Sequence, residues 1–112
     1  MLRTPSDFAA LSAAPGVTTP LLGVRHRTIA ATESTPSLRL GIATSRKVGN
    51  AVVRNRIRRR LKSIARERAP QVRPGAEILI GVRAAASTAT SAELRAALTD
   101  CLRRARLVEV SA

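Results

Sequence analysis

The sequence predicts a small, single-domain α+β fold of the sandwich type, in which helices cover one face of a single sheet. Its 112 residues suffice for one modest core. Residues 38–45 and 76–83 alternate apolar and polar side chains, as half-buried strands do. Residues 51–68 and 91–106 instead repeat their apolar side chains with a helical period, each with one apolar stripe. The expected element order is α-β-β-β-α-β-α.

The N-terminal part is expected to supply one short helix and the first strands. Residues 5–12 form the helix, with Ser6 as its N-cap. A strand is expected within about 21–31, where β-branched residues alternate weakly. The strand at 38–45 follows a turn, and its inward side chains are those of Leu38, Leu40 and Ile42.

The longest helix is expected to begin after Asn50, a good N-cap residue, and to end before Pro70. At about 100° per residue its apolar side chains share one arc. That stripe consists of Val53, Ile57, Leu61, Ile64 and Ala65. The helix can therefore pack one face on a core.

The C-terminal part adds a strand and a helix. Residues 76–83 place Ile78, Ile80 and Val82 on one face. Thr90 and Glu93 fit a capping box that begins a helix running to about residue 106. Its apolar stripe consists of Leu94, Ala97, Leu98, Cys101, Leu102 and Ala105. The whole of 1–112 is one domain, with 1–4 and 108–112 as loose tails.

Positive charge is concentrated in residues 46–68, which hold ten of the 20 lysines and arginines and one acid, Glu67. The formal net charge of the chain is +13. Like charges four residues apart on a helix repel one another, so a bound polyanion would stabilise this face. Arginine also outnumbers lysine eighteen to two, and its planar fork suits phosphate. The segment therefore predicts nucleic-acid binding, with a merely solvated charged face as the alternative.

The run from Ser45 to Lys62, SRKVGNAVVRNRIRRRLK, resembles the signature of the bacterial ribonuclease P protein component. In that family a strand ends in Ser-Lys-Lys and is followed by a Gly-Asn-Ala turn and then by Arg-Asn-Arg with further basic residues. The resemblance implies a fold like domain 2 of ribosomal protein S5, with a left-handed β-α-β crossover. General statistics would favour a right-handed crossover, and the family expectation is followed here.

The resemblance also implies a function. The chain would be the protein subunit of ribonuclease P, with ribonuclease P RNA and precursor tRNA as its partners. It would assist removal of the 5′ leader, while the RNA subunit carries the chemistry with magnesium. The protein would need no catalytic residue, metal site or protein partner of its own, and it would work in the cytoplasm, away from membranes.

Two sets of site residues follow. Phe8, Arg46 and Lys47 would border a cleft that holds the single-stranded leader, as the resemblance implies. Phe8 is also open to a plain core role, and Ser12 departs from the aromatic residue that many relatives carry there. The set expected against the catalytic RNA consists of Arg54, Asn55, Arg56, Arg58, Arg59, Arg60, Lys62 and Arg66.

Other chemistry finds little support. His26 has no metal-ligand partner at a suitable spacing, and Cys101 lies on an apolar stripe. The seven acids form no cluster, so a protein-borne nuclease site is not expected. Two rival functions stay open. One is a ribosomal-type protein or RNA chaperone, and the other is a binder of anionic membranes or nonspecific DNA.

Overall fold

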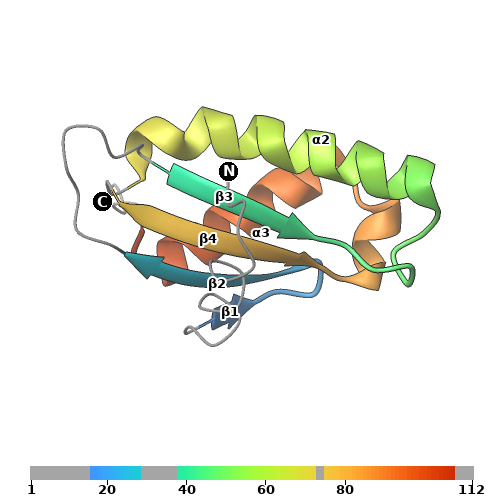
Figure 1. Cartoon of the computed structure of the whole chain (residues 1–112), viewed down its shortest axis with the longest axis horizontal. Helices are drawn as coiled ribbons and strands as arrows, with labels where there is room; N and C mark the ends of the chain where they lie inside the picture. Colours follow the sequence, from blue (N-terminus) through green and yellow to red (C-terminus); the bar gives the residue numbers. More distant parts are fainter. Residues whose placement is uncertain (1–15, 29–37, 73–74, 108–112) are drawn as a thin grey trace.

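The computed structural model describes residues 16–28, 38–72 and 75–107, shown in colour in Figure 1. Two long helices and a four-stranded sheet make up most of it. In chain order the elements are β1 (Gly16–Thr18), β2 (Leu22–Thr28), β3 (Leu38–Ala43), α2 (Ala51–Arg68), the 3-10 helix η1 (Ala69–Gln71), β4 (Ala76–Val82), the 3-10 helix η2 (Ala84–Thr88) and α3 (Ser91–Arg104). The predicted order β-β-β-α-β-α is confirmed. The helix expected at 5–12 lies outside the described residues.

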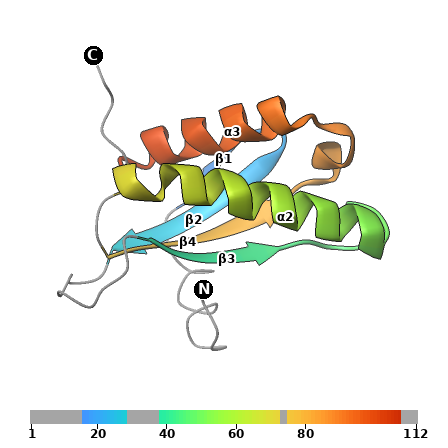
Figure 2. The ribbon, with the colours of Figure 1, turned by 90° about the horizontal axis from the view of Figure 1, so that it is seen from above.

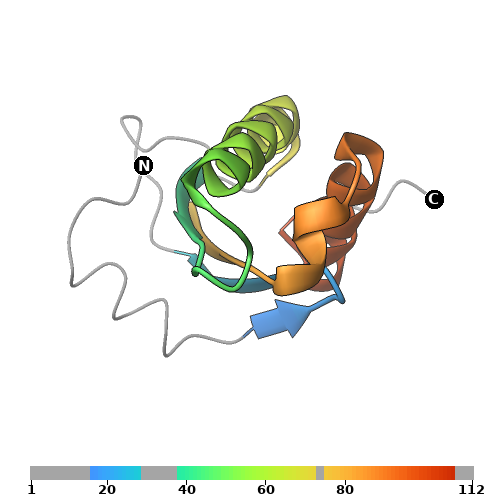
Figure 3. The same cartoon turned by 90° about the vertical axis from the view of Figure 1, so that its right-hand side faces the viewer.

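The sheet has the strand order β1-β2-β4-β3. β1 and β2 are antiparallel, β2 and β4 are antiparallel, and β3 and β4 are parallel. Both α2 and α3 lie on one side of this sheet (Figures 2 and 3). The prediction of a single sheet with helices on one face is therefore confirmed for the two described α-helices.

Strand register sorts the side chains between the two faces of the sheet. Val24, Ile80 and Ile42 lie in one row across β2, β4 and β3, because Ile80 is the partner of both Val24 and Ile42. This row faces the helices, and its neighbours Leu22 and Ile78 are fully buried. The predicted inward faces of these strands are thus correct, and the core lies between the sheet and the two helices.

The connection from β3 through α2 to β4 is left-handed. In Figure 1 both strands point to the right, β4 lies below β3, and the helix passes behind the sheet. Seen from the helix side with the strands pointing up, the second strand therefore lies to the left of the first. Most β-α-β units have the opposite hand. The expectation taken from the family resemblance is confirmed.

Element ends differ slightly from the prediction. The strand expected at 38–45 ends at Ala43, and the last helix ends at Arg104 instead of near residue 106. Arg106 has a φ of 59°, which is left-handed backbone that cannot continue an α-helix. The strand expected within 21–31 corresponds to β2, and residues 29–31 lie outside the described part.

The start of α2 is fixed by two residues. The side-chain oxygen of Asn50 accepts a hydrogen bond from the backbone N–H of Val53 at 3.0 Å, so the predicted N-cap is confirmed. Gly49 has a φ of +151°, and a Cβ there would lie 3.0 Å from the Val53 side chain. This turn therefore requires glycine.

We expect Ile57→Ala to lower the free energy of unfolding by about 2–5 kcal/mol, because the Ile57 side chain is buried between α2 and the sheet. Val52→Ala on the same helix is the matched control. The Val52 side chain is 68% exposed, so its truncation should change stability by less than about 0.5 kcal/mol. Urea unfolding of both variants measures the difference. Equal losses would show that the apolar stripe does not anchor the helix.

Candidate nucleic-acid interface

The outer face of α2 presents a continuous cationic surface, named here the α2 basic face. Because Ile57, Leu61 and Ile64 point into the core, the residues between them point to solvent. A shallow hollow of about 540 Å³ lies on this face. The exposed residues of the α2 basic face are Asn55, Arg56, Arg58, Arg59, Lys62 and Arg66. The predicted division of the helix into an apolar and a cationic face is confirmed.

Among the described residues, no acid pairs with these cations. Glu67, the acid of the basic segment, instead forms an ion pair with Arg95 of α3, with N–O distances of 3.2 and 3.3 Å. Within the described part of the chain, the side chains of the α2 basic face make no hydrogen bond or ion pair. Their mutual repulsion is therefore relieved only by solvent, by counterions or by a bound polyanion.

Arg54 and Arg60 differ from the rest of the predicted set, because each is only partly exposed. Arg60 donates a hydrogen bond to the backbone carbonyl of Ala89 at 3.4 Å, which ties α2 to the start of α3. The Nε atom of Arg54 is buried without a partner among the described residues. A buried donor of this kind needs an acceptor, which water or a ligand can supply. RNA contact by Arg54 and Arg60 stays a prediction.

The turn between β3 and α2 displays the other predicted cations. Arg46 and Lys47 are exposed, whereas Val48 beside them is buried. The backbone N–H of Val48 bonds the carbonyl of Ser45 at 3.1 Å, which closes the turn. Val48 therefore anchors the turn and leaves both cations in solvent. Phe8, the third residue of the predicted leader cleft, lies outside the described residues.

The face of the sheet opposite the helices carries a second hollow, of about 320 Å³, which the sequence analysis did not foresee. It forms where small residues fall in one row, since Gly81 of β4 pairs with Gly23 of β2 and with Ala43 of β3. The signal in the sequence was a glycine inside each of the strands β2 and β4. Arg46 and Lys47 follow Ala43 closely in the chain, at the same end of β3.

A buried acid on that same face was also missed. Glu77 is 0% exposed and pairs with Arg27 and Arg39, which stand beside it on the neighbouring strands. In the sequence alone, Glu77 was one of seven acids that form no cluster. The register shows why Glu77 is different, because an acid between two arginines in adjacent strands can be neutralised where it is buried.

The remaining reactive side chains have structural settings. Cys101 is fully buried on α3. Burial, together with the nearby charge of Asp100, raises the pKa of its thiol to about 11, and Arg104 opposes this shift. No group of three or more His, Cys, Asp or Glu residues that could hold a metal ion occurs among the described residues. In the same ranges, no helix combines the length and apolar character needed to span a bilayer.

Comparison with known proteins agrees with the basic segment and the fold. The family model for ribonuclease P matches residues 1–106. The chain belongs to the ribonuclease P protein family. A ribonuclease P protein component from Streptomyces avermitilis is 36% identical over 109 residues, covering 92% of this chain and 89% of that protein. One from Mycobacterium sp. (strain KMS) is 43% identical over 75 residues, covering 66% of this chain and 64% of the relative's length.

Solved structures of RNase P proteins share the fold. The protein from Staphylococcus aureus superposes with a TM-score of 0.81 at 23% identity, covering 96% of both chains. The protein from Thermotoga maritima superposes with a TM-score of 0.77 at 25% identity, covering 92% of this chain and 94% of that one. Since identity is low and the fold similarity is high, the arrangement of sheet and helices tolerates wide sequence change.

We expect Glu77→Ala to destabilise the fold by about 1–3 kcal/mol, because it removes the buried carboxylate that two partly exposed arginines share. Asp100→Ala is the matched control. It removes a half-exposed carboxylate that pairs with Arg104 at 3.4 Å, and it should cost less than about 1 kcal/mol. Thermal and urea unfolding measure both losses. A cost for Glu77→Ala as small as that of the control would contradict a stabilising role for the buried pairs.

Proposed function

We propose that the chain is the protein subunit of ribonuclease P and assists endonucleolytic removal of the 5′ leader from precursor tRNA. The observation that carries the proposal is the α2 basic face, whose cations pair with no acid among the described residues and lie in the basic segment that the family model covers. In this proposal the protein binds ribonuclease P RNA and the leader, and the RNA carries the chemistry.

The α2 basic face would lie against phosphates of the catalytic RNA. Each phosphate that an arginine or lysine neutralises releases counterions, so binding should weaken steeply with salt. Arginine also forms two parallel hydrogen bonds to one phosphate, which fixes orientation as well as charge. Asn55 is exposed in the middle of this face and offers both a donor and an acceptor, which can set geometry that arginine alone cannot.

The open face of the sheet would hold the leader. The hollow would let an RNA strand approach the backbone closely at Gly23, Gly81 and Ala43, because these three residues have little or no side chain. Arg46 and Lys47 at the end of this sheet would neutralise its phosphates. Phe8 is proposed to stack on a leader base. These contacts carry little base specificity, which suits leaders of varied sequence.

Magnesium does not fit this protein surface. Divalent magnesium binds oxygen ligands, chiefly carboxylates and phosphates. The side chains of the α2 basic face are cations with one amide, so they would repel the ion. In the proposal magnesium is therefore held by RNA phosphates. A cytoplasmic location belongs to the same proposal, and the free, buried Cys101 is compatible with a reducing compartment.

A role at membranes is disfavoured by the packing of α2. An interfacial helix must insert its apolar face into lipid. Here that face is occupied, because Ile57 and Leu61 are 3% and 0% exposed within the core. A cleavage assay distinguishes the ribosomal or chaperone role from the ribonuclease P role. A ribosomal-type protein or RNA chaperone would bind RNA without accelerating the cleavage of precursor tRNA.

The deciding experiment is cleavage of precursor tRNA by ribonuclease P RNA of the same organism at low magnesium, with and without the protein. We expect faster cleavage with correct 5′ ends, because the protein would reduce repulsion between the two RNAs. Tight RNA binding without any acceleration would favour the chaperone or ribosomal role. Absence of RNA binding at moderate salt would reject the ribonuclease P role and also the chaperone or ribosomal role.

Arg56→Ala should reduce the slope of log affinity against log salt for ribonuclease P RNA by about one unit, because one phosphate contact is lost. The melting temperature should stay unchanged, since the Arg56 side chain is exposed and forms no hydrogen bond or ion pair with the described residues. Arg103→Ala, an exposed arginine on α3, is the control and should leave the slope unchanged. A wild-type slope for Arg56→Ala would remove that residue from the interface.

A further inference from the structure

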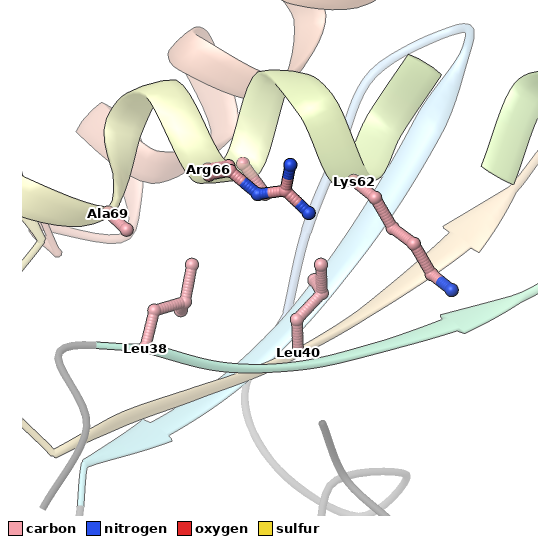
Figure 4. Close-up of a pocket in the computed structure, with 6 residues that line it drawn as sticks. Leu38, Leu40, Lys62, Arg66 and Ala69 are labelled. Carbon is pink, nitrogen blue, oxygen red and sulfur yellow. The ribbon is translucent and has the colours of Figure 1, made fainter. Parts of the chain in front are cut away.

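A groove of about 330 Å³ runs between β3 and the C-terminal half of α2 (Figure 4). It lies on the helix side of the sheet, whereas the hollow over Gly81 opens on the other side. β3 is an edge strand of the sheet as described, so the groove is open along that edge. The residues that line the groove are Leu38, Leu40, Lys62, Ala65, Arg66 and Ala69.

The groove has an apolar floor and a cationic rim. Leu38 and Leu40 point from β3 toward the helix, and Arg66 extends from α2 across the space above them, while Lys62 reaches toward the strand farther along (Figure 4). Lys62 and Arg66 are exposed, and neither side chain forms a hydrogen bond or ion pair with another described residue. A flat apolar group could therefore lie between the leucines and the guanidinium plane, with an anion beside Lys62.

This combination of chemistry fits a nucleotide. Unpaired bases of RNA stack on flat side chains, including the planes of arginine guanidinium groups, and bury their faces on apolar surface. The phosphate of the same nucleotide supplies the anion. The volume is also at the lower end of the range for small-molecule sites, which is appropriate for one nucleotide.

The position of Lys62 indicates which RNA supplies the nucleotide. Lys62 lines this groove and also lines the hollow on the α2 basic face, together with Asn55 and Arg59. An RNA strand on the α2 basic face would therefore pass the mouth of the groove. The leader, in contrast, is proposed to lie on the opposite side of the sheet.

We propose that the groove between β3 and α2 receives one unpaired base of the catalytic RNA, clamped between Leu38, Leu40 and Arg66. The inference rests on the proposed function and extends it. The cationic face would thus supply affinity through phosphates, and the groove would fix the register of the RNA by accepting one nucleotide at one place.

The chain has one Phe and no Tyr or Trp, so the protein itself has almost no aromatic ring that could shift a methyl resonance. An upfield methyl shift on RNA binding therefore reports a base of the RNA. Methyl NMR spectra of the full-length protein are recorded with and without perdeuterated ribonuclease P RNA, for wild type and for Phe8→Leu. A base stacked in the groove should shift the Leu38 and Leu40 methyl resonances upfield in both proteins. The methyl resonances of Leu22 and Leu102, which are buried elsewhere, should not move.

Bound RNA without an upfield shift at Leu38 and Leu40 would overturn the proposal, as would a shift produced by precursor tRNA alone and not by ribonuclease P RNA. Failure of the RNA to bind at all would reject the proposed function itself. Separate titration of the two RNAs, with binding followed by filter retention, distinguishes these cases. If the groove instead bound an acidic peptide as an added strand beside β3, the proposal would also be overturned, because a peptide has no base.

A filling substitution gives an independent readout. Ala69→Met places a longer side chain in the groove while leaving Lys62 and Arg66 intact. We expect about a tenfold loss of affinity for ribonuclease P RNA, in line with the loss of one stacked base, and an unchanged salt slope. Ala85→Met, on exposed η2, is the control and should bind as wild type. Wild-type affinity of a folded Ala69→Met variant would overturn the proposal. If that variant does not fold, the methyl shifts of the wild-type protein decide whether a base occupies the groove.

Discussion

Burial of the apolar stripe of α2 is the constraint on which the rest of the structure depends. Ile57, Leu61 and Ile64 are at most 3% exposed, and they fix the rotation of the helix about its own axis. Once that rotation is fixed, Arg58, Arg59 and Lys62 point outward, and Arg60 lies at the edge of the cationic face. A single packing event therefore determines both the core and the direction of the strongest positive charge in the molecule.

The placement of the few acids completes this arrangement. Glu77 is buried between two arginines of the sheet, Glu67 joins α2 to α3 through Arg95, and Glu93 caps α3 at Thr90. Each of these carboxylates serves a structural contact away from the α2 basic face. Among the described residues, the acids are thus engaged away from that face and leave its charge unpaired, and a polyanion is the ligand that would relieve it.

The sequence predicted those parts of the fold that depend on local signals. The helix at 51–68 follows from an unbroken apolar period between Asn50 and Pro70, and the capping box at Thr90 follows from two residues alone. The left-handed crossover could not be derived in this way, because periodicity contains no information on handedness. It came from the resemblance of the basic segment to a known family.

Features that depend on strand register escaped the sequence analysis. Glu77 became notable only when Arg27 and Arg39 were placed beside it, and the small-residue hollow required Gly23, Gly81 and Ala43 to fall in one row. The groove below Arg66 likewise needs the packing distance between helix and sheet. Sequence patterns predict which face a residue occupies, whereas pairing between distant strands decides which residues meet.

The setting of Cys101 has a consequence for how the protein responds to oxidants. Peroxides and disulfides react with the thiolate, so reactivity depends on ionisation and access. A fully buried thiol with a pKa near 11 is almost entirely protonated at neutral pH and is out of reach. Because it is the one cysteine of the chain, the folded protein has no sulfhydryl through which redox stress could modify it. Its surface charge is therefore insensitive to cysteine oxidation for as long as it stays folded.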